Sequence, residues 1–445
     1  ASKALAGAKF ELANGKTGET SQLAVGDDGT LELRGVLDVG VPYSLRETEA
    51  PVGYRLDPTV FSFWLDGSGN LVARDAGPYR VVAGEVAVVM ADEPATAVLT
   101  KVSATDGRPL EGAEFTLEGS FADGSREQRL VTDADGNAQI GLLVGGERYT
   151  LTETAPPAGH RWLSGSAVLA VAPDGTLAVV ALGEGASELE QALTVEGGAL
   201  GIRVADEPTR LTLGKTDASD TPHPLTGARF VLINAHTGSV SLHEVDDPAG
   251  LVLTGVLDVE TPYILQEVVA PDGYRLDPTP FAFSLAPDGT LVAQDAGGYR
   301  VGADGVSIVL ADEELGVDLE KVGSDGEPLT GAVYALSGVF SDSAGAVQTR
   351  TLAFGGGSSL SVGHLLAGET YTLVEQVAPA GHVCVGAELS FSIDEVGRAV
   401  LAEGADASLL TLTGDGRGLV VHDRPTELTL EKVDASDPTK TLAGA

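Results

Sequence analysis

Short runs of alternating apolar and polar residues recur along almost the whole chain, separated by Asp-Gly and Pro turns. Side chains of a β-strand point alternately to its two faces, so this period of two predicts strands with one buried face. Glycine is abundant, at 58 of 445 residues, and no long amphipathic helical pattern interrupts the runs. The pattern therefore predicts an all-β protein built from many short strands.

Two groups of motifs alternate along the chain and predict tandem domains. Type A domains share GYRLDPTVFSF (Gly53 to Phe63) and GYRLDPTPFAF (Gly273 to Phe283), whereas type B domains share EGAEFTLEGSF (Glu111 to Phe121) and TGAVYALSGVF (Thr330 to Phe340). About a hundred residues per repeat are enough for an independent core. The expected order is A-B-A-B, with a first domain at 1–94, a second at 95–208, a third at 209–314, a fourth at 315–425, and 426–445 as the first strand of a following type A domain.

Lysine occupies one recurring position in these repeats. Between residues 17 and 431 the chain contains only three lysines, Lys101, Lys215 and Lys321, and Lys432 continues the series. Each follows a leucine at i−2 and another apolar residue at i−4. In a strand these side chains share one face, so each lysine is predicted to point toward a core. Because lysine is almost never buried without a group that neutralises it, the pattern predicts buried acidic partners.

Two acidic series keep the same register as the lysines. The glutamates each follow a leucine at i−2 and a tyrosine at i−4, and the aspartates follow apolar residues at both places: Glu47, Glu153, Glu267 and Glu375, then Asp92, Asp206, Asp312 and Asp423. Each complete repeat thus directs three ionisable residues inward from three strands. A solvated face or protective edge charges would explain one such residue, but not a dozen in one register.

A buried amine beside a buried carboxyl predicts an amide bond. Burial favours the neutral form of both groups, so the lysine amine can attack the aspartate carboxyl carbon with loss of one water. The glutamate of the same domain, protonated for the same reason, would polarise the carboxyl and carry protons. The pairs expected from domains flanked by both residues are Lys101–Asp206, Lys215–Asp312 and Lys321–Asp423. Such chemistry is single-turnover self-crosslinking and not enzymatic; a non-covalent buried triad is the alternative.

The segments that carry the glutamates resemble those of collagen-adhesin B-type (CnaB, SpaA-like) domains. They are YSLRETEAPVGY (Tyr43 to Tyr54), YTLTETAPPAGH (Tyr149 to His160), YILQEVVAPDGY (Tyr263 to Tyr274) and YTLVEQVAPAGH (Tyr371 to His382). KVSATDGRPLEGAEFTL (Lys101 to Leu117) and KVGSDGEPLTGAVYAL (Lys321 to Leu336) resemble the lysine strand and following turn of that family, and TDADGNAQIGLLVGGERYTL (Thr132 to Leu151) its central hairpin. The resemblance implies prealbumin-like, Ig-like β-sandwiches. Because all four acid positions are aspartate, where many members have asparagine, the bond would release water and not ammonia.

The junctions between repeats have a constant length. Each aspartate lies nine residues before the next lysine: 92 to 101, 206 to 215, 312 to 321 and 423 to 432. None of these junctions is Gly/Ser-rich, and Pro94, Pro208 and Pro425 stiffen three of them. A short junction of constant length predicts a constant rotation between neighbours and therefore a rod.

The two ends of the chain are out of phase with the domains. The first domain has Glu47 and Asp92 but no lysine strand, whereas Lys432 has no acidic partners after it. ASKALAGA at residues 1–8 also resembles TKTLAGA at residues 439–445. One hypothesis is that a lysine strand directly precedes Ala1 in a longer parent protein. The other is that Lys432 of one molecule completes the first domain of another, as in donor-strand complementation.

The net charge of −38 argues against binding to nucleic acid or insertion into anionic membranes. Cys384 has no disulfide partner and is expected to be a small buried residue. Asp133 and Asp135 are expected in a hairpin turn and not a calcium loop, and His382 with Cys384 lacks further metal ligands. No metal and no cofactor is predicted.

Together these patterns predict the stalk or fibre region of an extracellular adhesin or pilus-like protein on a Gram-positive-type cell surface. Its expected partners are neighbouring domains of the same array and, in one alternative, other copies of itself in a strand-exchanged filament. A ligand-binding adhesin head is the second alternative; it would need one domain with a long additional loop.

Overall fold

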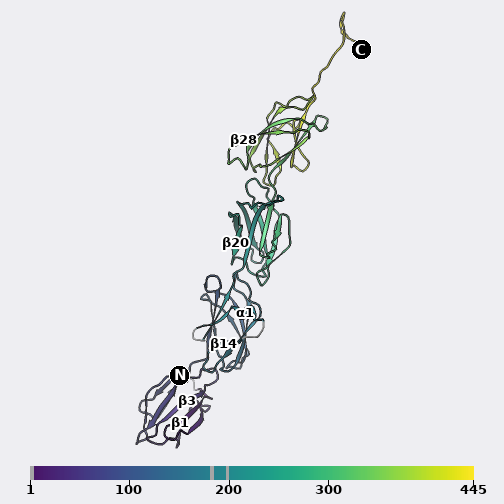
Figure 1. Ribbon diagram of the computed structural model, residues 1–445. Helices are drawn as coiled ribbons and strands as arrows, with labels where there is room; N and C mark the ends of the chain where they lie inside the picture. The colour runs from purple at the N-terminus through teal and green to yellow at the C-terminus, as the bar shows by residue number, and fades with distance from the viewer. Residues whose placement is uncertain (1–4, 181–184, 197–199, 445) are drawn as a thin grey trace. The chain divides into compact units, whose positions relative to one another are not determined.

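The computed structural model describes residues 5–180, 185–196 and 200–444 (Figure 1). Strands form nearly all of the regular structure, and the one helix within these ranges is the five-residue α1 (Glu188–Ala192) in the second domain. The sheets form successive pairs, which are tandem β-sandwiches. The all-β prediction is confirmed.

The second domain shows the complete two-sheet arrangement. One sheet has the order β11-β8-β16-β15 and the other the order β10-β9-β12-β13-β14. The strands are β8 (Ala97–Ser103), β9 (Glu114–Glu118), β10 (Glu127–Val131), β11 (Asn137–Ile140), β12 (Arg148–Ala155), β13 (Ser166–Val171), β14 (Leu177–Val180), β15 (Leu193–Glu196) and β16 (Gly201–Asp206).

The first and last strands of this domain, β8 and β16, lie side by side and run parallel. In their register Val204 lies opposite Lys101, and Asp206 lies opposite Ser103. Asp206 is two residues beyond Val204, so the period of two places it on the same face as Lys101. This pairing brings together residues about a hundred positions apart in the sequence.

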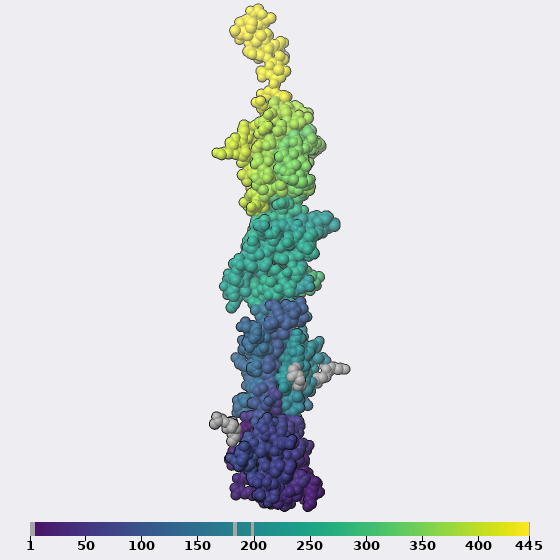
Figure 2. Space-filling view, turned by 90° about the vertical axis from the view of Figure 1, so that its left-hand side faces the viewer, coloured from purple at the N-terminus to yellow at the C-terminus, as the bar shows by residue number. Residues whose placement is uncertain are grey.

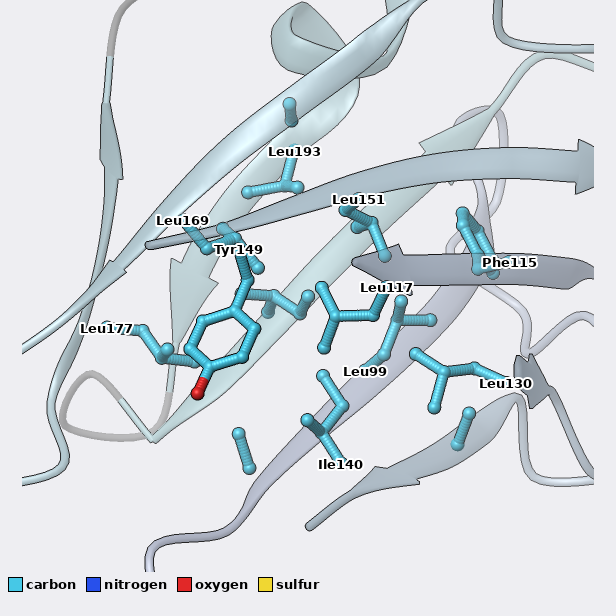
Figure 3. Packing of buried hydrophobic residues seen from close by; sticks show 14 of the residues in the cluster. Leu99, Phe115, Leu117, Leu130, Ile140, Tyr149, Leu151, Leu169, Leu177 and Leu193 are labelled. Atoms are coloured by element: carbon cyan, nitrogen blue, oxygen red, sulfur yellow. The ribbon is translucent and has the colours of Figure 1, made fainter. Parts of the chain in front are cut away.

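The core of the second domain lies between its two sheets (Figure 3). Leu99 on β8 faces Leu117 on β9 and Leu151 on β12, and all three side chains are buried. The turn that follows β10 packs against the lysine strand: Gly136 has φ +74°, and a Cβ there would lie 2.5 Å from the Lys101 carbonyl oxygen. A side chain at this position would therefore push the hairpin away from β8.

The third and fourth domains repeat this topology. Their sheets have the orders β20-β17-β25-β24 and β19-β18-β21-β22-β23, then β29-β26-β34-β33 and β28-β27-β30-β31-β32. The strands of the third are β17 (Arg210–Asp217), β18 (Ala228–Asn234), β19 (Val240–Val245), β20 (Leu251–Thr254), β21 (Tyr263–Val269), β22 (Phe281–Leu285), β23 (Leu291–Ala293), β24 (Tyr299–Val301) and β25 (Ser307–Asp312). Those of the fourth are β26 (Val317–Gly323), β27 (Val333–Val339), β28 (Val347–Ala353), β29 (Ser359–Val362), β30 (Thr370–Val377), β31 (Leu389–Ile393), β32 (Ala399–Leu401), β33 (Leu410–Leu412) and β34 (Gly418–Asp423). In both domains the first and last strands again run parallel.

The first domain has one complete sheet and one reduced sheet. The complete sheet has the order β2-β1-β3-β4-β5, whereas the other contains only β6 and β7. The strands are β1 (Lys9–Asn14), β2 (Thr20–Ala24), β3 (Tyr43–Glu49), β4 (Val60–Leu65), β5 (Leu71–Ala73), β6 (Tyr79–Val81) and β7 (Val88–Met90). Residues 31–34, which match β20 in sequence, do not form a strand here.

The C-terminal residues form a small hairpin of β35 (Val433–Asp434) and β36 (Asp437–Thr441). These residues are drawn in yellow in Figure 2. No helix in the described ranges has the length and apolar character needed to cross a membrane. The rod predicted from the constant junctions stays a prediction.

Candidate functional site

The site of the second domain combines one residue from each of three strands. Lys101 lies on β8, Asp206 at the end of the parallel strand β16, and Glu153 on β12 in the facing sheet. The Lys101 Nζ atom contacts Asp206 Oδ1 and lies 2.7 Å from Glu153 Oε1. All three side chains are 0% exposed. The structure therefore brings together the lysine, aspartate and glutamate that the sequence assigned to one domain.

The third domain has the same arrangement. Lys215 Nζ contacts Asp312 Oδ1 and lies 3.5 Å from Glu267 Oε1, again with all three side chains 0% exposed.

The fourth domain repeats it with small differences in distance. Lys321 Nζ lies 2.5 Å from Asp423 Oδ1 and 3.2 Å from Glu375 Oε1. These three side chains are also fully buried. Three successive domains thus place a primary amine against a carboxyl group, out of contact with water.

Burial changes the protonation of these carboxyl groups. It raises the pKa of Asp206 to about 7 and that of Asp312 to about 6, and it also raises the pKa of Asp423. The pKa of Glu267 is raised to about 7 by the same loss of solvation, and that of Glu153 is raised as well. A protonated carboxyl can lose its hydroxyl group as water, which a carboxylate cannot. In these carboxyl groups, burial therefore favours the protonated form that an amide-forming reaction requires.

Each glutamate is held by a backbone N–H group ten residues further along the chain, a contact that the alternating pattern of the strands does not predict. The N–H groups donate to the Oε2 atoms in all four domains: Asp57 to Glu47 (3.2 Å), Leu163 to Glu153 (2.8 Å), Asp277 to Glu267 (3.1 Å) and Val385 to Glu375 (2.5 Å). Because Oε2 is occupied, Oε1 is the atom left to face the lysine. The residue type at the donor position varies between aspartate, leucine and valine, so the sequence carried no signal for this contact.

Tyrosine side chains also contact the site and were not predicted. The Tyr334 hydroxyl group donates to Glu375 Oε1 at 3.0 Å in the fourth domain, where the second domain has Phe115. In the third domain, the backbone N–H of Glu267 donates to the Tyr299 hydroxyl group at 3.1 Å. Tyr299 lies in the motif AGGYR, and the first domain has the similar motif AGPYR around Tyr79. Because both type A domains share this motif, it was the sequence signal for a tyrosine beside the site in these domains.

The first domain has the two acids of the site without its lysine. Glu47 is 2% exposed, and burial together with the charge of Asp92 raises its pKa to about 7. Burial raises the pKa of Asp92 as well. Lys432, the remaining lysine of the series, is exposed on the C-terminal segment.

The other candidate residues lie outside these triads. His160 is buried, and its Nδ1 lies 2.9 Å from the Ala158 carbonyl oxygen. Asp133 accepts the N–H groups of Asp135 and Asn137, which is the geometry of a turn. Among the residues that the structure describes, no three metal-binding side chains are grouped to hold an ion.

The prediction that Cys384 is buried is wrong, because its side chain is exposed. Cys384 occupies the position of Trp162 in the second domain. Trp162 donates its indole N–H to the Glu153 carbonyl oxygen, and Cys384 Sγ lies 3.6 Å from that of Glu375. The position lies at the surface of the sandwich, so a short side chain there remains accessible to solvent.

Comparison with known proteins identifies the domain family. The SpaA prealbumin-like fold domain matches residues 1–76, 95–184 and 209–297, more than half of the chain. No curated protein matches the chain.

Three solved structures illustrate the similarity. The Bacillus anthracis TIE protein is 18% identical over 89% of this chain and 67% of its own, with a TM-score of 0.33. The pilus adhesin SpaC from Lactobacillus rhamnosus GG is 15% identical over 95% of this chain and 57% of its own, with a TM-score of 0.32. A streptococcal ancillary pilin is 16% identical over 74% of this chain and 98% of its own, with a TM-score of 0.27. Because these identities and TM-scores are low, the family assignment rests on the sequence match. The chain belongs to the family of SpaA prealbumin-like domains.

Proposed function

We propose that this chain is part of the stalk of a bacterial surface adhesin or pilus-like protein, and that its domains are stapled by Lys–Asp amide bonds. The observation that carries the proposal is the contact between lysine and aspartate on the parallel first and last strands of three successive domains. The family match and the resemblance to collagen-adhesin B-type domains support a location on a Gram-positive-type cell surface. The net charge of −38 fits a soluble, self-repelling array.

The bond would form without a cofactor. The neutral lysine amine attacks the aspartate carboxyl carbon, a C–N bond replaces a C–O bond, and the hydroxyl group leaves with a proton as water. The glutamate beside the amine accepts and returns the protons that move between nitrogen and oxygen. Each site reacts once on its own chain, so this is self-modification and not turnover of an outside substrate.

The staple would stabilise each domain and protect it against force. In the chain-entropy model, closing a loop of about a hundred residues stabilises a domain by about 4–5 kcal/mol. Tension that enters at the first strand would cross the amide bond directly to the last strand. The strands between them would then not be pulled out of the sheets. A non-covalent triad offers neither effect, because buried ion pairs are weak stabilisers.

The mass of the intact, denatured chain tests the proposal. We expect a mass lower by three waters than the sequence requires, one for each of the second, third and fourth domains. Lys101→Arg, Lys215→Arg and Lys321→Arg serve as matched controls, and each should restore one water relative to its own sequence mass. A chain of full sequence mass, in which an amine reagent labels all three lysines after denaturation, would contradict the proposal.

A further inference from the structure

The outer face of the β19-β18-β21-β22-β23 sheet in the third domain carries two rows of apolar side chains. In the first row Val240 on β19 lies opposite Ile233 on β18, which lies opposite Ile264 on β21. In the second row Leu242 lies opposite Val231. On β18 and β21 these positions alternate with buried ones, so the rows face away from the core. Val240 is 64% exposed and Leu242 is 61% exposed.

The first domain, which is also of type A, is polar at the same positions. Thr20 takes the place of Val240, and Gln22 lies opposite Glu11 in the second row. The Gln22 amide donates to the Glu11 carboxylate at 3.5 Å, and Arg46 pairs with the same carboxylate at 3.1 Å. A domain of this type therefore does not need apolar residues on its outer face. Contiguous exposed apolar side chains are typical of interaction surfaces.

β19 is also the edge strand of its sheet. It pairs with β18, and within the described ranges no strand pairs with its other edge. Natural proteins protect such edges with polar or charged residues. The corresponding edge strands of the other three domains each place two polar side chains outward: Thr20 and Gln22 in β2, Glu127 and Arg129 in β10, and Thr349 and Thr351 in β28. β19 lacks this protection at Val240 and Leu242.

The charges beside β19 indicate the chemistry of a segment that fits this edge. Glu244 ends the second row and is paired with Arg229 at 3.1 Å. Asp246 and Asp247 follow it, both exposed and without an ion pair among the residues that the structure describes. A complementary segment is extended, apolar at alternate positions and basic at the end beside these aspartates. A second copy of the chain is disfavoured, because each copy carries a net charge of −38.

We propose that β19 of the third domain is the docking site for an extended, basic segment of a partner protein. The segment would add a strand to the sheet by β-augmentation, in which backbone hydrogen bonds supply affinity and alternate side chains supply specificity. Its apolar side chains would form cross-strand pairs with Val240 and Leu242. Its lysine or arginine side chains would lie beside Asp246 and Asp247. This binding role goes beyond the proposed stalk and does not depend on the amide bonds.

A capped peptide in which three valines alternate with four threonines, with two lysines at each end, serves as the probe. Its binding to the full chain is followed by fluorescence polarisation of the labelled peptide. We expect binding that weakens as the salt concentration rises, and no binding when glutamate replaces the lysines. A peptide of the same composition with valine at every third position should bind at least about tenfold more weakly, because it has no two valines on one face at adjacent positions.

Variants of the chain test the two parts of the site. The double variant Val240→Thr/Leu242→Gln carries on β19 the residue types that β2 has at these positions, so its denaturation midpoint should equal that of the parent. It should bind the alternating peptide at least about tenfold more weakly. Val347→Thr is the matched control, because Val347 is 74% exposed on the edge strand β28, and it should bind the peptide as the parent does. Asp246→Asn/Asp247→Asn should weaken binding and reduce its dependence on salt.

Hydrogen exchange locates the bound peptide. The alternating peptide should slow amide exchange in residues 240–245, because a new strand would pair with this edge. Unchanged exchange in β19, equal binding by the parent and the Val240→Thr/Leu242→Gln variant, or a parent that does not bind the peptide would each overturn the inference. Self-association of the parent that this double variant abolishes would also overturn it, since a second copy would then be the occupant of the edge.

Discussion

Replacing Glu267 should prevent the crosslink of the third domain while leaving the other two intact. Glu267 is 1% exposed, its Oε1 lies 3.5 Å from Lys215 Nζ, and its Oε2 is fixed by the Asp277 N–H group. Glu267→Ala removes the only carboxyl group besides Asp312 that contacts this lysine among the described residues. Loss of a positioned proton carrier slows a reaction about 10²–10⁴-fold. We therefore expect the Glu267→Ala chain to be heavier by one water than its fully bonded form.

The unstapled third domain should also be less stable. Losing the closure between residues 215 and 312 removes about 4–5 kcal/mol in the chain-entropy model. Alanine adds a cavity to this loss, so Glu267→Gln is the better variant for denaturant unfolding, because it keeps the volume and the contact with the Asp277 N–H group. Glu375→Gln is the matched control in the fourth domain and should affect that bond alone. Formation of the Lys215–Asp312 bond at the normal rate in Glu267→Gln and Glu267→Ala would refute the proton-carrier assignment.

Three further predictions concern single sites. The first domain should lose about 3 kcal/mol of folding stability between pH 4.5 and about pH 7, because the pKa of Glu47 is raised from 4.5 to about 7 and its buried carboxyl group ionises as the pH rises. Glu47→Gln should flatten this pH dependence in unfolding curves that follow Trp64 fluorescence in a Trp162→Phe background. Tyr334→Phe should slow bond formation in the fourth domain about fivefold, which is the effect of losing one hydrogen bond of about 1 kcal/mol. The bond should still form, because Phe115 occupies this position in the second domain. An unchanged rate in a time course of intact mass would contradict the assignment. Leu319→Ala should destabilise the fourth domain by about 2–5 kcal/mol because this side chain is 0% exposed, and equal denaturation midpoints for the variant and the parent would argue against the assigned core.

The inward direction of the site residues could be predicted from the sequence because a buried charge is rare. Lys101 and Glu153 lie in strands whose other inward positions are apolar, and the alternation of side chains places each charged residue on the same buried face. The prealbumin-like sandwich was predicted from the resemblance of the recurring motifs to collagen-adhesin B-type domains. Contacts from loops carry no such period. The Leu163 N–H group and the exposure of Cys384 therefore became visible only in the structure.

The first domain shows a second limit of sequence analysis. Leu31–Arg34 and Leu251–Thr254 have closely similar patterns, yet only the latter is a strand. β20 lies next to the lysine strand β17 in its sheet, and the described part of the first domain has no strand of this kind. Strand formation thus depends on a partner elsewhere in the chain, which a local pattern does not contain.

The adjacency of first and last strands has a consequence for damage to the polypeptide. With Lys101 bonded to Asp206, the backbone between these residues becomes one side of a closed ring. A protease that cuts any exposed loop within the ring, such as the turn at Asp133–Gly136, would open the ring without dividing the molecule. With all three bonds formed, a single cut between Lys101 and Asp423 would separate the array only in the short junctions between an aspartate and the next lysine. In each crosslinked domain, continuity of the polypeptide would thus depend on the amide bond and a few residues of backbone, and not on the integrity of every loop.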